Sequence, residues 1–521
     1  MKLSFNGSLV FATFLAAVFG SWLAVLAPPI NLAWTAWFAY VPMLMLLRKD
    51  SIKATAWLSF VYGFFGNFFI FLWMIDTMTV FSSLAWGYAL GILILYVAVL
   101  AFPFVLLFLS VHFFRKRIGG LWVFLFPALQ VGLEYLSTFL FIFPYQHGVS
   151  QFQVPYVFQL VSLTGIWGLS FLILLVNALI AEFFFRRLEG RSMTMKPLLL
   201  VSLLFCANYI YGYWQFNRIE ESLNRTTPTR VLQLQNDINA YQWKARMGDR
   251  KAIFAADRYW VNETQKHLSK DIDLVVWPES SVSQYMTHQQ LQNKLGYLSR
   301  QGEFELVLGG KFRKKNNDGL VKHNSAFMLN KSGHVQSRYD KMHLVPVSEY
   351  LPFKEYLPDS VTSIKMDSGH FQPGKNAVIS SGETATLAFP ICYEAIFQST
   401  FRRFLDADLM LNITNDIWFS DTSGPYLHAM LAIVRAVEFG QPLYRAAYSG
   451  LSFYVEPHGQ VKHQTQLFEK VSRVIDIRVA KMPSFYARYG DWFVVVCFVL
   501  ILGGIFYSLL FNRFKSVREH H

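Results

Sequence analysis

Cysteine is scarce in this chain: 521 residues include only three, Cys206, Cys392 and Cys497. Three cysteines without a C-x-x-C spacing exclude a disulfide framework, a thiolate zinc site and a thioredoxin-like redox site. We therefore expect no metal and no cofactor. Charge is scarce too, at 16% of residues against 53% hydrophobic ones, and the mean hydropathy is +0.30. Such a composition excludes an ordinary soluble protein of several domains and indicates a membrane protein.

Long apolar runs divide the chain. A helix needs roughly 20 mostly apolar residues to cross a bilayer, and eight runs qualify, near 9 to 27, 30 to 47, 55 to 75, 84 to 112, 120 to 143, 157 to 185, 196 to 215 and 493 to 511. The first lacks a convincing small-residue cleavage site, so we expect it to be retained as a helix. The sequence predicts a membrane domain over 1–215, one globular domain over 216–490, and an eighth span with a tail over 491–521.

Lysine and arginine are absent from the loops near 28 to 29, 76 to 83 and 144 to 156. They gather in the alternate loops and the tail, at Arg48, Lys49, Lys53, Arg115, Lys116, Arg117, Arg186, Arg187, Arg191, Lys196, Arg513, Lys515 and Arg518. By the positive-inside rule this pattern predicts cytoplasmic termini and places 216–490 on the outer side. Basic loops also account for the net charge of +13, so we expect no nucleic acid as a partner.

Within 216–490 the pattern changes to short β-rich runs. They are Val231 to Leu234, Leu274 to Trp277, Glu305 to Gly309, Ser325 to Leu329, Ala385 to Cys392, Leu409 to Ile413, Leu451 to Val455 and Val471 to Ile477. Helical patterns cover Arg246 to Leu268 and Pro425 to Phe439, with Gly440 as a stop. The mixture predicts a layered α/β domain. Several strands end in polar residues, where α/β domains usually place their chemistry.

Cys392 is the only cysteine outside the apolar runs, so it is either a packed thiol or a nucleophile. A nucleophile needs a base or a positive charge nearby. Glu279 follows an apolar strand that would bury its carboxylate and suit it to act as a base, although a glutamate after a strand, taken alone, is more often a surface residue. Lys341 could favour a thiolate and stabilise an oxyanion, or simply be solvated. His343 is the rival base, or a structural histidine.

These three segments together resemble the nitrilase superfamily, whose glutamate, lysine and cysteine follow one another in this order. The motifs are Trp277-Pro278-Glu279, then Tyr339-Asp340-Lys341-Met342-His343-Leu344-Val345-Pro346-Val347-Ser348-Glu349-Tyr350-Leu351-Pro352-Phe353, then Cys392-Tyr393-Glu394. With Asn415-Asp416-Ile417-Trp418-Phe419, Gly424-Pro425 and His428, nearly the whole chain is similar to apolipoprotein N-acyltransferases. The resemblance implies a multi-pass α-helical bacterial inner-membrane protein of about eight spans with an inserted nitrilase-like αββα sandwich facing the periplasm.

The resemblance also assigns roles to particular residues. Cys392 would be the nucleophile, Glu279 the general base and Lys341 the oxyanion stabiliser. Supporting or substrate-binding roles would fall to Glu349 as a second essential carboxylate, Tyr393 as an oxyanion donor through its N–H, Glu394 as a brace, and Trp243 and Trp418. Arg435, Glu438 and Arg445 would form an internal ion-pair network with a scaffolding role.

The implied reaction is a double displacement. Cys392 would take an acyl chain from a phospholipid, of the phosphatidylethanolamine kind, and hold it as a thioester. The α-amine of the diacylglyceryl-cysteine of an apolipoprotein would then receive it. We expect the enzyme to act as a monomer with the membrane, a phospholipid donor and a diacylated apolipoprotein as partners.

Some positions depart from the family's pattern. Ser348 stands where glycine is usual, Tyr448 where asparagine is common, and Gln130 and Tyr145 where tryptophans are expected; Trp243 precedes a lysine rather than following one. These departures indicate a divergent member or a paralogue with altered substrate preference.

Two other functions share parts of this pattern. A membrane-bound amidase or lipid hydrolase would use the same three residues with water as the acceptor. A transporter with an outer binding domain would leave Cys392 merely buried. Against the transporter, no span carries a charged residue well inside it apart from Glu134, and no pair of broken helices occupies matching halves.

Overall fold

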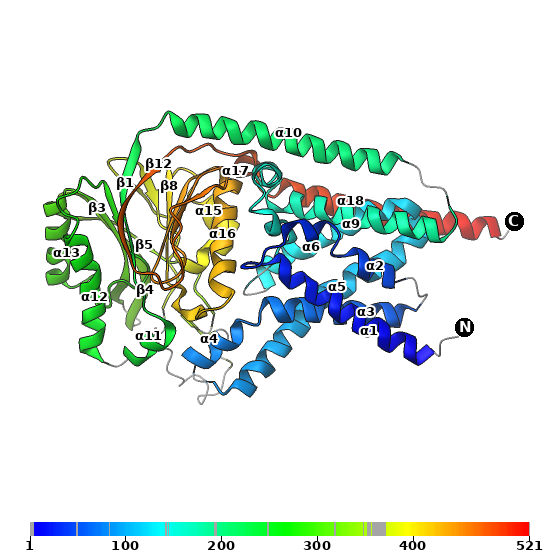
Figure 1. Cartoon of the computed structure of the whole chain (residues 1–521), viewed down its shortest axis with the longest axis horizontal. Coiled ribbons are helices and arrows are strands. Elements are labelled where there is room, and N and C mark those ends of the chain that lie inside the picture. The colour runs from blue at the N-terminus through cyan, green and yellow to red at the C-terminus, as the bar shows by residue number, and fades with distance from the viewer. Residues whose placement is uncertain are drawn as a thin grey trace. The chain divides into compact units, whose positions relative to one another are not determined.

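A computed structural model of the chain (Figure 1) describes residues 5–47, 51–82, 84–140, 143, 145–191, 195–246, 249–316, 319–346, 348–351, 356 and 371–519. The chain divides into two compact units, one comprising Met1–Phe216 with Arg488–His521 and the other Asn217–Ala487. Of the basic residues used to predict orientation, Arg48 and Lys49 lie outside the described residues, as do Val347, Pro352 and Phe353 of the lysine motif.

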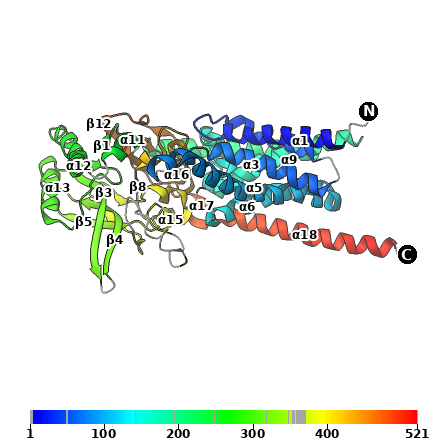
Figure 2. The ribbon, with the colours of Figure 1, turned by 90° about the horizontal axis from the view of Figure 1, so that it is seen from below.

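The first unit is helical. Its main helices are α1 (Phe5–Ser21), α2 (Val41–Leu46), α3 (Ile52–Ile70), α4 (Met74–Phe81), α5 (Trp86–Ile118), α6 (Trp122–Leu140), α7 (Pro155–Phe158), α8 (Val161–Thr164), α9 (Ile166–Leu188) and α18 (Trp492–Glu519), together with the larger part of α10 (Lys196–Asn224). Figure 2 shows α1, α3, α5, α6 and α9 running side by side. Many of the exposed side chains on these helices are large and apolar, as expected where the solvent is lipid.

Five helical stretches among the described residues are long and apolar enough to cross a membrane, or six if α3 and α4, bent by 51°, form one span. One of the five, Trp86–Phe139, contains both α5 and α6. The predicted run from 30 to 47 is not a continuous helix, because a 3-10 turn at Ala33–Trp37 precedes the short α2. Pro42 in the first turn of α2 has no N–H with which to continue a helix from upstream.

The over-long run predicted from 157 to 185 is also divided. Gly165, with φ +65°, separates the short α8 from α9. This left-handed backbone conformation favours glycine and ends one helix before the next begins. The helix that remains, α9, has 23 residues, a length that matches the bilayer.

The basic last turns of α5 and α9 meet at one end of this unit. Arg115 Nε and Arg186 Nε lie 3.3 and 2.7 Å from the two carboxylate oxygens of Glu182, and Arg115 Nη2 lies 2.6 Å from Glu189 Oε1. Two of the basic clusters that the sequence places on the same side therefore lie together in space.

The second unit contains two six-stranded sheets. The first has the order β12-β1-β2-β3-β4-β5 and the second β11-β10-β9-β8-β7-β6. The strands are β1 (Pro228–Gln235), β2 (Leu274–Val276), β3 (Glu305–Asn316), β4 (Gly319–Leu329), β5 (Val335–Asp340), β6 (Ile379–Ser381), β7 (Thr386–Ala388), β8 (Leu409–Thr414), β9 (Leu443–Ala447), β10 (Phe453–Val455), β11 (Val461–Lys462) and β12 (Val471–Arg478). Parallel pairs such as β1 with β2 and β8 with β9 lie inside the sheets.

Helices flank the two sheets of this unit. They are α11 (Ala240–Arg246), α12 (Arg250–Gln265), α13 (Gln289–Gly302), α15 (Gln398–Arg402), α16 (Gly424–Phe439) and α17 (Phe485–Tyr489), the last running into the first unit. Figure 1 shows α12 and α13 on one side of the sheets and α15 and α16 on the other. The layers are thus helix, sheet, sheet, helix, the αββα arrangement that the resemblance implied.

Each of the eight predicted strands has a counterpart, and α16 stops at Gly440, whose φ is +62°. The run from Ala385 to Cys392 is wrong at its end, because β7 stops at Ala388 and Cys392 opens a 3-10 helix, Cys392–Ile396. Strands β5, β6, β9 and β11 were not predicted.

Candidate active site

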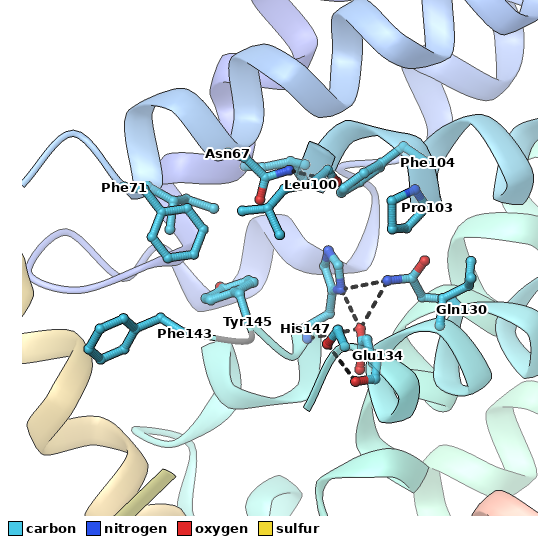
Figure 3. A pocket seen from close by; sticks show the side chains of 14 residues that line it. Asn67, Phe71, Leu100, Pro103, Phe104, Gln130, Glu134, Phe143, Tyr145 and His147 are labelled. Carbon is cyan, nitrogen blue, oxygen red and sulfur yellow. Dashed lines mark hydrogen bonds and ion pairs between the residues drawn. The ribbon is translucent and has the colours of Figure 1, made fainter. Parts of the chain in front are cut away.

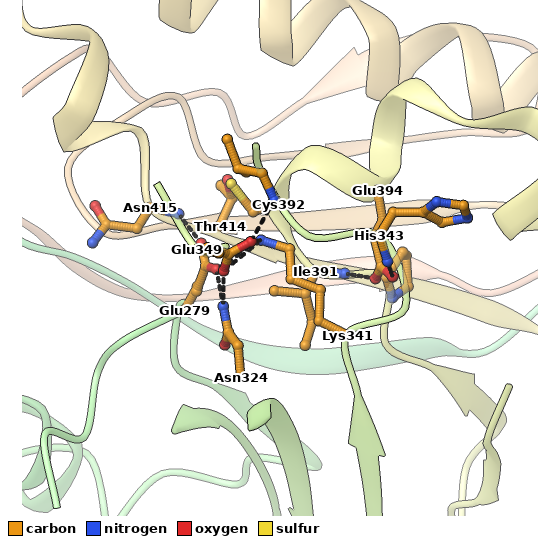
Figure 4. Close-up of polar contacts among 12 residues, drawn as sticks. Glu279, Asn324, Lys341, His343, Glu349, Ile391, Cys392, Glu394, Thr414 and Asn415 are labelled. Atoms are coloured by element: carbon orange, nitrogen blue, oxygen red, sulfur yellow. Dashed lines mark hydrogen bonds and ion pairs between the residues drawn. The ribbon is translucent and has the colours of Figure 1, made fainter. Parts of the chain in front are cut away.

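The residues predicted to react, Glu279, Lys341 and Cys392, come from both sheets of the second unit. Glu279 follows β2 and Lys341 follows β5 in the first sheet, whereas Cys392 follows β7 in the second. All three side chains are buried. Figure 4 shows their polar ends gathered in one place, although Glu279 and Cys392 lie more than a hundred positions apart in the chain.

Glu279 accepts hydrogen bonds on both carboxylate oxygens. Its Oε1 receives Asn324 Nδ2 at 2.7 Å and Lys341 Nζ at 3.3 Å, and its Oε2 receives the backbone N–H of Asn415 at 3.0 Å. Gly309 of β3 allows the approach, because a Cβ there would lie 2.5 Å from Glu279 Cα. The carboxylate is therefore held by neighbours from both sheets.

Lys341 lies between two carboxylates. Its Nζ is 3.3 Å from Glu279 Oε1 and 3.0 Å from Glu349 Oε2, and Asn324 Nδ2 also bonds to Glu349 Oε1 at 2.7 Å. Burial alone would lower the pKa of Lys341, but the charges of Glu279 and Glu349 outweigh burial and hold the pKa above its ordinary value. Lys341 is therefore a fixed ammonium, and Glu349 joins the site as the resemblance implied.

Cys392 has a backbone φ of +49°, a left-handed conformation that is uncommon for a residue with a Cβ and is typical of functional turns. Burial raises the pKa of its thiol, and the charge of Glu279 raises that pKa further, while Lys341 and a hydrogen bond from Thr414 lower it. The balance leaves the thiol pKa above its ordinary value. At neutral pH the resting thiol keeps its proton, so it requires a base when it reacts.

Glu394 ties the cysteine turn to the lysine segment. Its Oε2 accepts from the backbone N–H of Ile391 at 2.7 Å, and its Oε1 accepts from the N–H groups of Met342 and His343 at 2.7 and 3.1 Å and from the Tyr339 hydroxyl at 2.7 Å. Burial raises the pKa of Glu394 to about 7, against the opposing effect of these donors. The position fits the predicted brace.

His343, the rival base, faces elsewhere. Its imidazole stacks on Phe397 with ring centroids 4.5 Å apart, and Figure 4 shows it beside Glu394 rather than beside the thiol. Burial lowers the pKa of this imidazole, as does the charge of Arg403. Glu279, and not His343, is the side chain that Figure 4 shows beside Cys392 and Lys341.

A second buried hydrogen-bond network holds the backbone carbonyl of Cys392. His428 of α16 donates from Nε2 to the carbonyl of Cys392 at 3.1 Å, and its Nδ1 lies 2.8 Å from Asp416 Oδ1. Arg445 of β9 bonds to Asp416 Oδ2 at 2.8 Å and to Asn412 Oδ1. Burial opposes ionisation of Asp416, but Arg445 and His428 outweigh it and lower its pKa to about 2.

The ion-pair network expected among Arg435, Glu438 and Arg445 is divided. Arg435 pairs with Glu438 at 2.9 Å one turn along α16, whereas Arg445 pairs with Asp416. The division follows from the fold. Arg445 lies on β9 opposite Asn412 of β8, and its side chain reaches Asp416, which follows β8. Arg445 thus belongs to the cysteine's support rather than to the helix pair.

The predicted tryptophans occupy different surroundings. Trp243 of α11 packs edge-on against Tyr448 with centroids 5.1 Å apart, and Trp260 packs on Tyr448 at 5.0 Å. Trp418 lies in the 3-10 helix Asp416–Phe419 and is partly exposed. Tyr448, a departure from the family pattern, therefore fills the space between two indoles. Tyr393 is buried and packs against Phe397.

No role was predicted for Asn324, and Asp416 and His428 were named only as members of a motif. Asn324 lies inside β4, where asparagine is disfavoured, and this exception was the signal that could have marked it. The motif alone does not show that Asp416 and His428 are partners, because their contact depends on the packing of α16 against the 3-10 helix Asp416–Phe419.

One further group has the composition of a metal site. Among the described residues, Glu220, Glu456 and His458 bring their ligand atoms within 4.8 Å of one another. However, His458 Nδ1 accepts from the N–H of Gln460 at 3.4 Å, and Nε2 lies 3.0 Å from Glu220 Oε2. The Nε2 position therefore carries the hydrogen, and the group is a hydrogen-bonded pair rather than a ready ligand set.

Comparisons with known proteins decide the family. Residues 19–179 match the model for the apolipoprotein N-acyltransferase N-terminal domain, and residues 238–484 match the carbon-nitrogen hydrolase model. An apolipoprotein N-acyltransferase of Geobacter metallireducens is 31% identical over 517 residues, covering 97% of this chain and 96% of that protein. The chain belongs to the apolipoprotein N-acyltransferase family. The predicted fold class, a multi-pass helical membrane protein with a nitrilase-like α/β domain, is confirmed.

Other members of the family are similarly related. Apolipoprotein N-acyltransferase 1 of Treponema denticola is 28% identical, covering 97% of both chains, and the enzyme of Brucella melitensis is 30% identical, covering 94% of this chain and 93% of its own. Among solved structures, an amidase from Nesterenkonia sp. is 18% identical with a TM-score of 0.37, over 51% of this chain and 94% of that chain. The family assignment rests on the sequence comparisons and not on that last likeness.

Proposed function

We propose that this protein transfers an acyl chain from a phospholipid, through a thioester on Cys392, to the α-amine of the diacylglyceryl-cysteine of apolipoproteins. The observation that carries the proposal is a buried thiol placed against a carboxylate and an ammonium, Glu279 and Lys341, in a member of this family. Burial suits a thioester carrier, since water that reached it would hydrolyse it. No metal or cofactor enters the proposal.

In the first half of the reaction, Glu279 takes the proton of the Cys392 thiol as the sulfur attacks the phospholipid's ester carbonyl. The oxyanion that forms is stabilised by the Lys341 ammonium and by the backbone N–H of Tyr393. When the C–O bond breaks, Glu279 returns the proton to the leaving alcohol. The products are a lysophospholipid and a Cys392 thioester.

In the second half, the α-amine of the lipoprotein attacks the thioester carbonyl. Glu279 takes a proton from the attacking nitrogen, the C–S bond breaks, and Cys392 regains its proton as the amide forms. Lys341 and Tyr393 stabilise the second oxyanion in the same way. Glu349 keeps the ammonium of Lys341 in place, and Glu394 keeps the cysteine turn aligned with the lysine segment.

The proposal includes an orientation in the bacterial inner membrane. Both termini would be cytoplasmic, and the catalytic domain, taken as residues 216–490, would face the periplasm, with the chain acting as a monomer. The joined basic ends of α5 and α9, through Arg115, Arg186 and Glu182, support a common cytoplasmic side for these two turns. Trp243 and Trp418 remain proposed substrate contacts.

The test is chemical. Purified full-length protein is incubated with a phospholipid, and the Cys392 peptide is examined by mass spectrometry for an added acyl mass; a diacylated lipopeptide is then supplied. We expect the adduct to form and to discharge onto the lipopeptide amine. The absence of an adduct, or an unchanged adduct in Cys392→Ser, would refute the mechanism. Discharge as free fatty acid with the lipopeptide left unmodified would assign a hydrolase instead.

A further inference from the structure

The first unit contains a partly open cavity among its helices, lined by both polar and apolar side chains. It lies between α3, α5, α6 and the segment that leads into the 3-10 helix His147–Gln151 and has a volume of about 50 Å³, room for a few water molecules or a group of three or four heavy atoms. Figure 3 shows Gln130, Glu134 and His147 on one side of it. An ionisable residue inside a membrane bundle is costly and usually functional.

One carboxylate oxygen of Glu134 accepts several hydrogen bonds, and the other accepts none from the described residues. Oε1 lies 2.5 Å from His147 Nδ1, and it accepts from the backbone N–H of His147 and from Gln130 Nε2, both at 3.2 Å. Oε2 has no hydrogen-bond partner among the described residues, although Glu134 is only 3% exposed. A buried carboxylate oxygen without a donor is expensive.

Among the described residues that line the cavity, His147 is the one basic side chain beside Glu134. The Tyr40 hydroxyl is hydrogen-bonded to Nε2 of His147, and this nitrogen is the acceptor that the described structure gives the hydroxyl. In this arrangement Nε2 accepts from the hydroxyl and Nδ1 donates to Glu134. No lysine or arginine is among the described residues that line the cavity.

Two further polar groups on the wall can accept hydrogen bonds. Asn67 uses its amide nitrogen on the carbonyls of Gly63 and Leu100, at 2.8 and 3.3 Å, which leaves its amide oxygen as the free end. The Tyr145 hydroxyl lines the same cavity and has no partner among the described residues. A ligand that satisfies this set brings several N–H or O–H hydrogens, and a carboxylate oxygen among the acceptors suits a charged donor.

Aromatic and aliphatic side chains form the rest of the wall. Phe71, Phe104 and Phe143 line the cavity together with leucine and isoleucine side chains. Aromatic faces attract organic cations, and apolar walls suit methylene groups. A bare metal ion would instead need six or more oxygen ligands or a rigid octahedral shell, which this wall does not supply.

We propose that this cavity binds the primary ammonium group of a lipid, with Glu134 Oε2, the Asn67 amide oxygen and the Tyr145 hydroxyl as acceptors. Two lipids carry that chemistry in a membrane of this kind: one with an ethanolamine headgroup and one with a free α-amine on a lipidated cysteine. The binding requires neither Cys392 nor acyl transfer, so it stands or falls separately from the proposed reaction.

The test measures lipid retention on the full-length protein by native mass spectrometry. Cys392→Ala serves as the parent, so that no chemistry consumes the lipid. Ethanolamine-, choline- and glycerol-headed lipids with the same acyl chains are offered in equal amounts. We expect the ethanolamine lipid to be retained about tenfold over the others, the value of a charge-assisted hydrogen bond. Choline provides charge without an N–H, so equal retention of the choline lipid would overturn the proposal.

Variants identify the acceptors. Glu134→Gln keeps the size of the side chain and should abolish the preference, while Glu182→Gln, a carboxylate of the same unit paired with Arg115 and Arg186, should preserve it. Tyr145→Phe removes one acceptor without loss of volume and should weaken the preference roughly threefold. Should Glu134→Gln fail to fold, Tyr145→Phe decides. Preference unaffected in both Glu134→Gln and Tyr145→Phe would overturn the proposal.

Competing ligands separate the two sources of the ammonium. A diacylated lipopeptide is added with its α-amine either free or acetylated. Displacement of the ethanolamine lipid by the free amine alone assigns the cavity to both lipids, and failure of both forms to displace it assigns the cavity to the ethanolamine headgroup. Equal displacement by the acetylated form would contradict recognition of an ammonium.

Discussion

Lys341 Nζ lies 3.3 Å from Glu279 Oε1, with both side chains buried between the two sheets of the second unit. This contact joins the proposed base to the proposed oxyanion stabiliser in the resting protein. It also means that the carboxylate has two electrostatic partners, an ammonium that favours its charge and a thiol whose ionisation its charge opposes.

Glu279→Gln should acidify the Cys392 thiol and yet abolish acylation. The Glu279 charge raises the pKa of this thiol, so its removal lowers the pKa, while loss of the base should slow acyl transfer by a factor of about 10² to 10⁴. The pH dependence of alkylation of the Cys392 peptide measures the first effect, and adduct formation measures the second. A variant with a more acidic thiol and full activity would remove Glu279 from the mechanism.

Lys341→Met should destabilise the second unit by about 3–5 kcal/mol, because it leaves Glu279 and Glu349 buried without their cation. Thermal unfolding of the purified protein measures the loss. Lys462→Met, at a lysine that is 38% exposed, is the matched control and should change stability by under about 0.5 kcal/mol. Adding Glu349→Gln to Lys341→Met should restore part of the loss, and no restoration would contradict this account of the site.

Glu394→Gln should reduce turnover about 10- to 100-fold while the protein remains folded, since small misplacements of a nucleophile have effects of this size. The amide oxygen can still accept from Met342, His343 and Tyr339, but the amide NH₂ then faces the N–H of Ile391. Steady-state kinetics with lipopeptide, beside a melting curve, checks the prediction. Full activity would show that the cysteine turn does not depend on this brace.

Acid should loosen the support behind Cys392 between about pH 4 and pH 2. The pKa of Asp416 is lowered to about 2 from 3.8, so its stabilising contribution is complete above the unfolded value and is lost as the pH falls through the folded one. The shift corresponds to about 2 kcal/mol. Melting temperatures measured from neutral pH to pH 2 should show this loss in the wild type, and Asp416→Asn should lack that part of the pH dependence. Identical pH profiles would contradict the assignment.

The sequence predicted most reliably those features that the lipid solvent or a family motif determines. Hydropathy located α1, α3, α5, α6, α9, α10 and α18, because lipid demands long apolar helices whatever the tertiary fold. It did not reveal the breaks at Pro42 and Gly165, where single residues interrupt an apolar run. Composition averaged over 20 positions cannot register such local backbone effects.

The missed strands have a common explanation. The residues of β9, Leu443–Ala447, are all buried, so the alternation that marks a half-exposed strand is absent, and its two alanines favour helix. The order of the strands also follows from long-range pairing rather than from local sequence. For this reason the motifs predicted Glu279, Lys341 and Cys392, whereas the place of Asn324 and the pairing of Asp416 with His428 emerged only from the packed structure.

The pairing of β1 with β12 has a consequence for how such a protein can arise. These antiparallel neighbours place Pro228 opposite Arg478, so the first and last strands of the second unit begin and finish side by side. A module whose two ends adjoin can be gained, lost or exchanged at a single loop of a host chain without rethreading either sheet. The same geometry makes residues 217–487 a candidate for transplantation, in which a different helical anchor could carry the same chemistry to another membrane.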